Sequence, residues 1–280
     1  MKKTITAHCL VKNEARFIWY SVMSVIKHVD NVLLYDTGST DGTQDIIREI
    51  KKADKENKVL FKEYGTVTPQ TFPLVRQEML EKTQTDWFIV VDGDEIWWED
   101  SIRRVVLEIK SNGDKLESIV VPTINLVGDI YHYQEEAAGN YNLAGKKGHY
   151  NLRAVNKKIP GLHSSGEHGV WGWVDEEKKM IQDRDVVAFV NSPYLHATHL
   201  PRAMEQQGEH LVPKRYQKLK HEIGIEFPSD FYYPEVLFRP RPKAVPSVWL
   251  KMQTGFKVRA YLETPLRKLK RRIFPRRVGY

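Results

Sequence analysis

Short apolar runs alternate with helical patterns over the first hundred residues of the chain. Strands are predicted at residues 4–11, 31–35, 58–61 and 87–91. The last of these is a continuous run of five apolar residues, as in a strand buried on both faces of a sheet. Apolar positions at helical spacing predict helices over residues 15–29, 46–50, 73–82 and 102–109. This alternation is typical of βαβ units and predicts an α/β fold with a mostly parallel central sheet flanked by helices.

The pattern weakens beyond residue 115. Strands are predicted at residues 118–126 and 186–190, and residues 131–148 form a polar excursion rich in glycine and asparagine. Five prolines occur in the stretch from Pro228 to Pro246, both included. Because proline interrupts helices and central strands, this stretch is predicted to be an extended strap over the surface.

Composition is that of a globular protein. The chain has 280 residues, of which 41% are hydrophobic and 28% charged, which favours one large domain or one domain with an extension. A single cysteine, Cys9, excludes an intrachain disulfide and a multi-cysteine zinc site. The first residues make a poor signal peptide, and no apolar run approaches the roughly 20 residues that span a bilayer. We therefore expect a cytoplasmic protein that is not integral to a membrane.

Positive charge is concentrated at the end of the chain. The net charge is +7, and all of it lies after Glu263, where seven Lys and Arg residues occur without an acidic one. Leu266, Leu269, Ile273 and Phe274 are interleaved with these cations. Such a segment favours an anionic membrane surface as the partner of residues 265–280, at the inner face of the membrane and with no nucleic acid involved. A solvated helix end is the alternative.

Acidic and polar clusters follow three of the predicted strands. They are Lys12-Asn13-Glu14, the loop from Asp36 to Gly42, and Asp92-Gly93-Asp94-Glu95. Ligands of open α/β sheets bind beyond the carboxyl ends of the parallel strands, so these clusters should converge. Converging acids repel unless a cation lies among them, and hard oxygen ligands favour Mg²⁺ or Mn²⁺. Asp92 and Asp94 point the same way in an extended segment and can share one metal, with a solvated turn as the alternative.

Several other enzyme classes fit the sequence less well. No G-x-G-x-x-G follows the first strand and no P-loop motif occurs, which disfavours a Rossmann oxidoreductase and a P-loop nucleotidase. A sugar nucleotidyltransferase would need a glycine-rich turn where Lys12-Asn13-Glu14-Ala15 stands, and a haloacid-type phosphatase would carry its D-x-D on the first strand. Nucleic-acid binding through the basic tail is the non-enzymatic alternative, and the neutral body of the chain disfavours it.

Taken in order, these motifs resemble those of family 2 glycosyltransferases with the GT-A fold. The matching residues are Cys9-Leu10-Val11-Lys12-Asn13-Glu14, residues 36–43, Arg76 and Asp92-Gly93-Asp94-Glu95. The resemblance covers residues 4–110 and is nearest to bacterial enzymes that add sugars to lipopolysaccharide cores or other cell-envelope glycans. It implies a GT-A domain over residues 1–200, with a nucleotide-sugar-binding half (1–110) and an acceptor-side half (111–200). Residues 201–280 would form a helical and proline-rich extension with the basic tail.

The resemblance also implies roles for individual residues. The reaction would be a metal-dependent, inverting transfer from a nucleotide diphosphate sugar, preferably UDP-linked, to an envelope glycan or lipid-linked saccharide. The nucleotide would contact Leu10, Val11, Lys12, Asn13, Glu14, Asp36, Arg76, Asp92 and Gly93. Mn²⁺ or Mg²⁺ would be bound by Asp94, Asp92 and His196, with His199 as the alternative to His196.

An inverting enzyme also needs a carboxylate that takes the proton of the acceptor hydroxyl. The resemblance favours Glu167 for this role, with Glu95 as the alternative; Glu167 can also be an ordinary surface residue. Four tryptophans near these segments can stack on sugar rings, although core packing is expected for at least two of them. They are Trp97, Trp98, Trp171 and Trp173.

Overall fold

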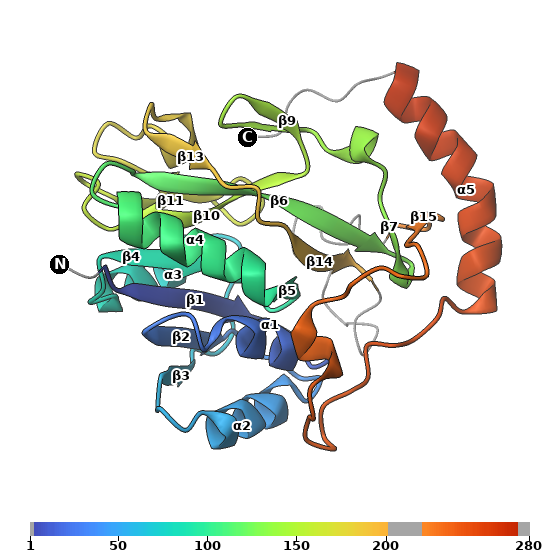
Figure 1. The fold of residues 1–280 in the computed structure, drawn as a ribbon, viewed down its shortest axis with the longest axis horizontal. Coiled ribbons are helices and arrows are strands. Elements are labelled where there is room, and N and C mark those ends of the chain that lie inside the picture. Colours follow the sequence, from blue (N-terminus) through green and yellow to red (C-terminus); the bar gives the residue numbers. More distant parts are fainter. Residues whose placement is uncertain (1–2, 201–219, 274–280) are drawn as a thin grey trace.

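The computed structural model describes residues 3–200 and 220–273, and a mixed β-sheet runs through the described part of the molecule (Figure 1). Its first half consists of parallel strands in the order β4-β1-β2-β3. These strands are β1 (Ile5–Val11), β2 (Asn31–Asp36), β3 (Val59–Glu63) and β4 (Trp87–Val90). All four lie within two residues of their predicted bounds. β1, β2 and β4 are buried on both faces and leave apolar runs in the sequence, whereas β3 is largely exposed.

The second half of the sheet is built around β6 (Ser118–Val127), which pairs with β7, β10, β13 and β14. β10 joins it to β4 in antiparallel pairing, and β5 and β15 lie at its margins. The strands of this half are β5 (Glu95–Trp97), β7 (Asp129–Tyr133), β10 (Tyr150–Asn156), β13 (Val187–Phe189), β14 (Tyr194–His199) and β15 (Ile225–Glu226). Two hairpins, β8–β9 (Tyr141–Leu143, Lys146–Gly148) and β11–β12 (His163–Ser165, Gly172–Val174), form separate small sheets.

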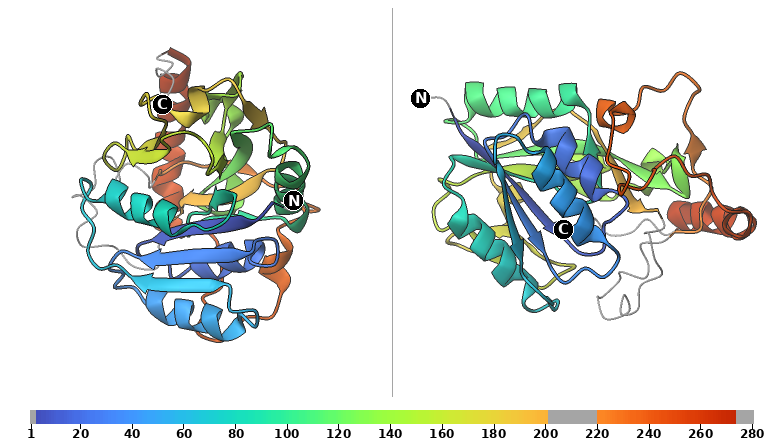
Figure 2. Two further views of the ribbon diagram at one scale, coloured as in Figure 1. Left: turned by 90° about the vertical axis from the view of Figure 1, so that its left-hand side faces the viewer. Right: turned by 90° about the horizontal axis from the view of Figure 1, so that it is seen from below.

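Helices cover both faces of the parallel half (Figure 2). They are α1 (Ile18–Val25), α2 (Thr43–Ala53), α3 (Phe72–Lys82) and α4 (Glu99–Asn112). Alternate β1 residues such as Ala7 and Cys9 share the main core with the apolar sides of α1, α2 and α4. Leu10, on the opposite face, packs with Val75 and Met79 of α3. The α/β fold is therefore confirmed, with helices on both sides of the sheet.

Three expectations from the sequence need correction in detail. The helix predicted over residues 15–29 is limited to α1. The polar excursion at 131–148 contains part of β7 and the β8–β9 hairpin, whose strands are too short to leave an alternating pattern. The strap at 228–246 has no α-helix or strand, but it includes one turn of 3₁₀ helix at Glu235–Phe238.

The chain continues from the strap into a long helix, α5 (Thr254–Ile273), at the edge of the molecule (Figure 1). α5 contains Pro265 and includes residues 265–273 of the predicted basic tail. The remaining tail residues, 274–280, and residues 201–219 of the predicted extension lie outside the described residues.

Candidate active site

The segments that follow β1 and β2 are joined by hydrogen bonds between side chains and backbone. The Asn13 backbone N–H donates to Ser39 Oγ (2.7 Å), and Asn13 Oδ1 accepts the Thr40 N–H (2.7 Å). The Glu14 N–H donates to Thr43 Oγ1 (2.8 Å). Asn13 has a φ of +58°, a left-handed conformation in which asparagine is enriched. The first two polar clusters of the sequence therefore meet at the carboxyl end of the sheet as one structure.

Asp36 is fully buried at the end of β2 and holds the loop that follows it. Its Oδ2 accepts the Ser39 N–H (3.1 Å) and the Gln44 side-chain amide (3.0 Å), and Oδ1 accepts the Ser39 hydroxyl. The carboxylate therefore fixes the loop geometry. Direct contact of Asp36 with uracil or ribose stays a prediction.

The other residues predicted to border the nucleotide lie around this loop. Leu10 and Val11 are buried, and the Val11 carbonyl accepts both the Thr37 N–H and the Thr37 hydroxyl (2.9 Å each). Lys12 is half-buried and Glu14 is buried. Leu10 and Val11 thus lie at the base of the site, at the end of β1. Direct contact of either residue with a nucleotide stays a prediction.

The buried Arg76 and the half-buried Asp92 form an ion pair next to these loops. Arg76 Nη2 lies 2.9 Å from Asp92 Oδ1, and the Arg76 side chain is 4% exposed. Its guanidinium also stacks on Trp171, 5.0 Å from the ring centroid. Within the described residues, Arg76 Nε and Nη1 are buried and have no hydrogen-bond partner. Such unsatisfied donors are costly to bury, and they mark a place where an anion would be stabilised.

Gly93 lets the turn after β4 approach the end of β1. A Cβ at this position would lie 2.8 Å from Val11 Cγ1 and 2.9 Å from Glu14 Cγ, closer than side chains can pack. The glycine of the D-G-D-E motif is therefore required by the close contact between two strand ends. The same contact brings Asp92 and Asp94 to the loops of the parallel half.

Sequence reasoning missed Arg153, which the antiparallel half contributes to the site from β10. Its guanidinium pairs with Glu95, lies 3.6 Å from Asp92 Oδ2 and donates to the Tyr194 hydroxyl (3.0 Å). Burial keeps the pKa of Asp92 from falling far, but Arg76 and Arg153 together hold it below its usual range. In the sequence, Arg153 is a single arginine in a segment (residues 149–156) whose hydrophobic pattern is weak. This pattern did not identify the segment as a strand of the sheet, so Arg153 could not be placed near the acidic turn.

Glu95 is fully buried, and its role as the alternative base stays a prediction. One oxygen pairs with Arg153 and the other accepts the Asp92 N–H (3.3 Å). Burial raises the pKa of Glu95 to about 7, with Asp92 and Asp94 adding to the effect and Arg153 opposing it. Its contacts are those of a positioning residue that fixes Arg153 and the turn at Asp92.

Asp94 and His196 lie together where β5 and β14 pair. His196 Nε2 is 3.5 Å from Asp94 Oδ1, and the Ala197 N–H donates to the Asp94 carbonyl (2.8 Å). His199 Nε2 is instead 3.1 Å from the Lys220 ammonium group. In the described ranges 3–200 and 220–273, no group of three or more His, Cys, Asp and Glu side chains is arranged to hold a metal. Asp94 and His196 form an acid–imidazole pair, whereas Asp92 is directed toward the two arginines.

Glu167 lies in the exposed turn of the β11–β12 hairpin. This turn packs against the start of α3, because His168 stacks on Phe72 with ring centroids 4.4 Å apart. Trp171 of the same turn covers Arg76. The hairpin thus borders the Arg76–Asp92 pair, and the role of Glu167 as base stays a prediction.

The tryptophans divide into core and surface groups. Trp97 and Trp173 are buried, and Trp97 stacks on Tyr194 with centroids 4.7 Å apart, which confirms core packing for two of the four. Trp98 and Trp171 are half-buried. Trp98 donates its ring N–H to the Tyr232 carbonyl (2.9 Å), so its indole is held by the strap.

Several solved structures resemble this chain at low sequence identity. S. aureus TarS shares 12% identity over 70% of this chain and 37% of its own, with a TM-score of 0.46. Mannosyltransferase PcManGT from Pyrobaculum calidifontis, in complex with GDP-Man and Mn²⁺, shares 14% sequence identity with this chain. The match covers 78% of this chain and 68% of PcManGT, with a TM-score of 0.43. Glucosyl-3-phosphoglycerate synthase from Mycobacterium tuberculosis, in complex with Mn²⁺, UDP and glucosyl-3-phosphoglycerate, shares 17% sequence identity with this chain. The match covers 78% of this chain and 77% of the synthase, with a TM-score of 0.43.

The chain therefore spans little more than a third of TarS. No curated protein sequence matches it significantly. Residues 9–166 match the family model for glycosyl transferase family 2. This match covers more than half of the 280 residues and runs from the end of β1 through the D-G-D-E turn to the β11–β12 hairpin. The chain belongs to glycosyltransferase family 2.

Proposed function

We propose that this protein transfers a sugar from a nucleotide diphosphate sugar, preferably UDP-linked, to a saccharide acceptor in one inverting displacement. The observation that carries the proposal is the meeting of Asp94 and His196 beside the Arg76–Asp92 pair. The donor would lie across the joined loops after β1 and β2, with its diphosphate near the turn at Asp94. Nucleotides bind at this end of open α/β sheets.

The donor set at Asp94 and His196 suits a divalent cation. A carboxylate oxygen and an imidazole nitrogen 3.5 Å apart are compatible with Mn²⁺ and, less well, with Mg²⁺. Two protein ligands leave most coordination positions open, as expected for a metal that also binds phosphate oxygens. When bound, such a cation would neutralise the charge that develops on the departing diphosphate.

The arginines position the acidic turn. Arg76 and Arg153 neutralise Asp92 and so allow Asp94 to lie close to it. The positive charge of Arg76 in addition favours an anionic donor near this turn. Asp92, held between two arginines, would act on the ribose or on the metal through a water molecule.

Glu167 is our proposed base for the acceptor hydroxyl. Its carboxylate is exposed and belongs to the hairpin that borders Arg76, whereas Glu95 is buried and ion-paired. The base would take the proton while the acceptor oxygen attacks the anomeric carbon and the carbon–diphosphate bond breaks.

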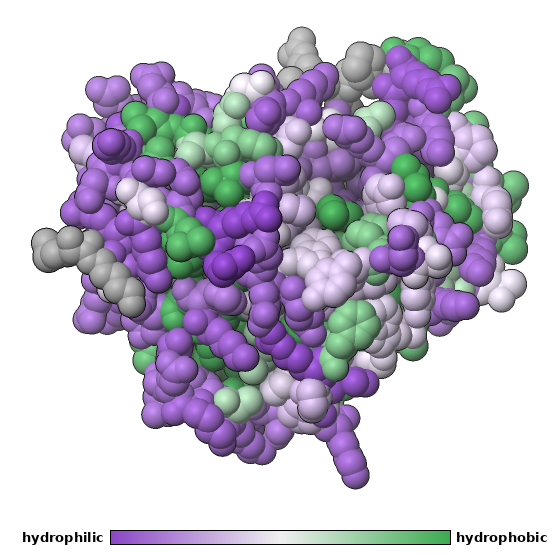
Figure 3. All heavy atoms as spheres, in the orientation of Figure 1, coloured by the Kyte–Doolittle hydropathy of each residue, from purple (hydrophilic) through white to green (hydrophobic). Residues whose placement is uncertain are grey.

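The acceptor would be a cell-envelope glycan or lipid-linked saccharide at the inner face of the membrane, as in lipopolysaccharide synthesis. Support comes from α5, whose exposed apolar residues form a stripe along the helix. Figure 3 shows apolar side chains interspersed with polar ones at that edge of the molecule. The stripe consists of Val258, Tyr261, Leu262, Leu266, Leu269 and Ile273, each 55–71% exposed. These residues recur at helical spacing and are accompanied by basic residues in the last turn, the pattern of a helix that lies on an anionic bilayer. No helix in the described part of the chain is long and apolar enough to cross a bilayer.

Vesicle sedimentation tests the membrane partner. We expect wild type to bind vesicles containing phosphatidylglycerol more strongly than pure phosphatidylcholine, and more weakly in high salt. Leu262→Ser with Leu266→Ser should lower this binding about tenfold or more, whereas Leu107→Ser on α4, where Leu107 is 51% exposed, should not. Equal sedimentation of all three proteins would contradict a docking role for α5.

Release of nucleoside diphosphate tests the reaction itself. We expect one donor from a panel of UDP- and GDP-sugars to release its nucleotide when Mn²⁺ and a mixture of envelope saccharides are present. EDTA should stop the release. Full turnover in EDTA, or no turnover with any donor, would contradict the proposal.

A further inference from the structure

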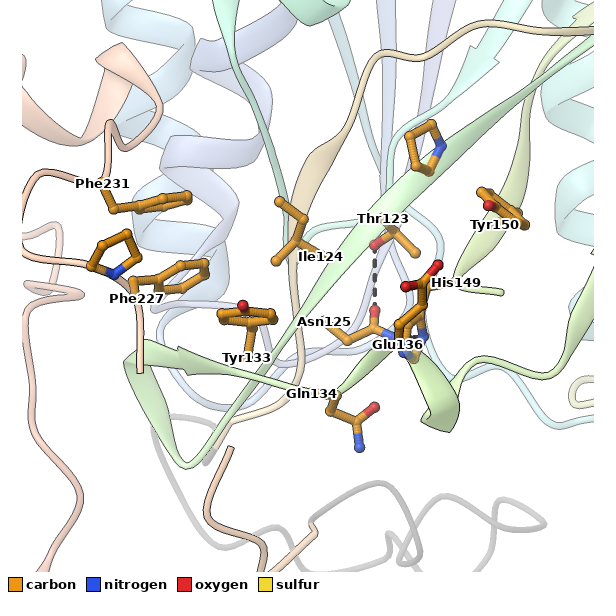
Figure 4. Close-up of a pocket in the computed structure, with 12 residues that line it drawn as sticks. Thr123, Ile124, Asn125, Tyr133, Gln134, Glu136, His149, Tyr150, Phe227 and Phe231 are labelled. Carbon is orange, nitrogen blue, oxygen red and sulfur yellow. Dashed lines mark hydrogen bonds between the residues drawn. The ribbon is translucent and has the colours of Figure 1, made fainter. Parts of the chain in front are cut away.

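A cavity of about 360 Å³ opens between β6, the end of β7, the start of β10 and the segment at residues 227–231 (Figure 4). Its volume is within the range of small-molecule sites. Thr123, Asn125 and His149 line one wall, and Tyr133, Phe227 and Phe231 line the other. A cavity with polar groups on one side and aromatic rings on the other suits a ligand with hydroxyl groups at its edge and an apolar face.

Strand register connects this cavity to the acid–imidazole pair. β14 runs parallel to β6, and His196 is the register partner of Asn125. Paired residues of neighbouring strands project from the same face of a sheet, so Asn125 and His196 lie side by side on one face. Asn125 is therefore one strand away from the site proposed for the diphosphate.

The polar wall is organised by a chain of hydrogen bonds. His149 Nε2 lies 3.0 Å from the Glu135 carbonyl, which can only accept, so this nitrogen donates and Nδ1 accepts from Asn125 Nδ2 (2.9 Å). Burial lowers the pKa of His149, which keeps the ring neutral. Asn125 Oδ1 also accepts from the Thr123 hydroxyl (3.3 Å). The orientation of the Asn125 amide is thus fixed, while its second N–H and a second oxygen lone pair stay available.

The opposite wall is a stack of aromatic rings. Tyr133 stacks on Phe227 with centroids 4.6 Å apart, and Phe227 stacks on Phe231 at 3.9 Å. Phe227 is 9% exposed, and Tyr133 and Phe231 are half-buried, so part of the stack faces the cavity. Such rings provide a flat apolar surface for the C–H face of a pyranose.

We propose that this cavity binds an uncharged pyranose ring of the acceptor saccharide, held between the aromatic stack and the Asn125–His149 amide–imidazole pair. The inference rests on the proposed function, because it assigns the acceptor side of the same reaction. Of the lining residues that the structure describes, none is Lys or Arg, and Glu136 is acidic. A phosphorylated or carboxylated ring would therefore meet no compensating charge from these residues and would be repelled by Glu136.

The cavity is also connected to the helix proposed to lie on the membrane. Gln134, another lining residue, donates to Glu222 (3.4 Å), and Glu222 pairs with Arg271 of α5 (2.5 Å). Arg271 also pairs with Glu135, which directly follows Gln134 (3.0 Å). The last turns of α5 are thus fixed beside one wall of the cavity. This placement suits an acceptor whose sugar is carried at the membrane surface.

Ligand-observed NMR in the presence of UDP and Mn²⁺ tests the cavity. The probes are methyl glycosides of glucose, galactose, mannose and N-acetylglucosamine, together with the matched sugar 6-phosphates. We expect saturation transfer to at least one uncharged glycoside and weaker transfer to its phosphate. Asn125→Ala should weaken the glycoside about 3- to 10-fold, the range for losing one or two neutral hydrogen bonds. Asn112→Ala, an exposed asparagine on α4, serves as the matched control and should have no effect.

Calorimetric binding of UDP to each variant separates the possible failures. If Asn125→Ala binds UDP like wild type and loses only the glycoside, the acceptor cavity is supported. Three results would overturn the cavity proposal while the donor site stands, each with UDP bound. The glycosides could fail to bind, they could bind Asn125→Ala as tightly as wild type, or they could bind less tightly than the sugar 6-phosphates. If neither UDP nor GDP binds wild type in the presence of Mn²⁺, the proposed function itself is contradicted, and the cavity proposal that rests on it falls with it. Tyr150→Ala, at the far side of the cavity, repeats the test should Asn125→Ala unfold.

Discussion

The proposed nucleotide-sugar-binding half of this molecule (residues 1–110, the donor half) and the proposed acceptor cavity hold their residues in different ways. In the donor half, the loops after β1 and β2 are joined to each other by side-chain–backbone hydrogen bonds, as between Asn13 and Thr40. The cavity is formed by segments far apart in the sequence, such as Tyr133 and Phe227, which contact through aromatic stacking. Hydrogen bonds between the two loops fix one geometry, whereas the geometry of a wall assembled from several segments depends on the position of each segment. We infer that the proposed donor site depends on hydrogen bonds within the parallel half of the sheet, whereas the proposed acceptor cavity depends on packing between distant segments.

Asp94→Ala gives the largest expected effect and tests whether catalysis depends on the donor half. Loss of the carboxylate removes a ligand of the proposed cation, which is worth several kcal/mol of transition-state stabilisation, so turnover should fall about 10³-fold or more. Nucleotide release by the purified variant measures this. Asp45→Ala, which removes an exposed partner of Arg48 on α2, is the control and should keep full turnover. An active Asp94→Ala would exclude Asp94 as an essential ligand.

Glu167→Gln tests the contribution of the hairpin. General-base catalysis is worth roughly 10²–10⁴-fold, so turnover should fall by that factor while UDP affinity is nearly unchanged. Steady-state kinetics and calorimetry measure the two quantities. Glu177→Gln, an exposed glutamate of the neighbouring loop, should behave as wild type. An unaltered rate in Glu167→Gln would place the base elsewhere.

Arg153→Met tests how the two halves are joined. It leaves Glu95 buried without its cation, and breaking a buried ion pair from one side costs about 3–5 kcal/mol of unfolding free energy. Urea unfolding measures the loss. Arg153→Met combined with Glu95→Leu should recover part of it, because both charges are then absent. A loss below 1 kcal/mol for Arg153→Met alone would show that the pair does not support the fold.

Gly93→Ala gives the smallest effect of the series. The new methyl group would press on Val11 and Glu14, and overpacking of this kind costs about 1–3 kcal/mol. Gly255→Ala on α5 is the matched control, because a Cβ there meets nothing within 4 Å and alanine favours a helix. Thermal unfolding of the two variants should therefore move in opposite directions, and similar shifts would contradict the close approach at Gly93.

The sequence was informative where structure is local. Buried parallel strands appear as apolar runs such as residues 87–91, and the acidic clusters stand directly after them. The α/β fold and the convergence of Asp36, Asp92 and Asp94 on one end of the sheet could therefore be predicted. The family match supports the same assignment.

The remaining features depend on contacts between distant residues. Arg153 reaches Glu95 across 58 positions, and β5 and β15 are only three and two residues long, too short for a pattern. The apolar stripe of α5 begins at Val258, seven residues before the basic tail predicted at residues 265–280. The charge pattern of the tail therefore did not indicate its first residues. The cavity wall at Phe231 lies in a stretch whose prolines predict only an extended chain.

Thermal unfolding with nucleotide diphosphates tests the central claim most directly, because a ligand that binds only the folded protein stabilises it by mass action. With UDP at 100 times its dissociation constant and Mn²⁺ present, wild type should gain about 2.7 kcal/mol, a rise of several degrees in Tm. EDTA or Asp94→Ala should remove most of this rise, and Asp45→Ala should keep it. A Tm that responds to neither UDP nor GDP, or that rises equally in EDTA, would contradict a metal-assisted nucleotide-sugar site at Asp94.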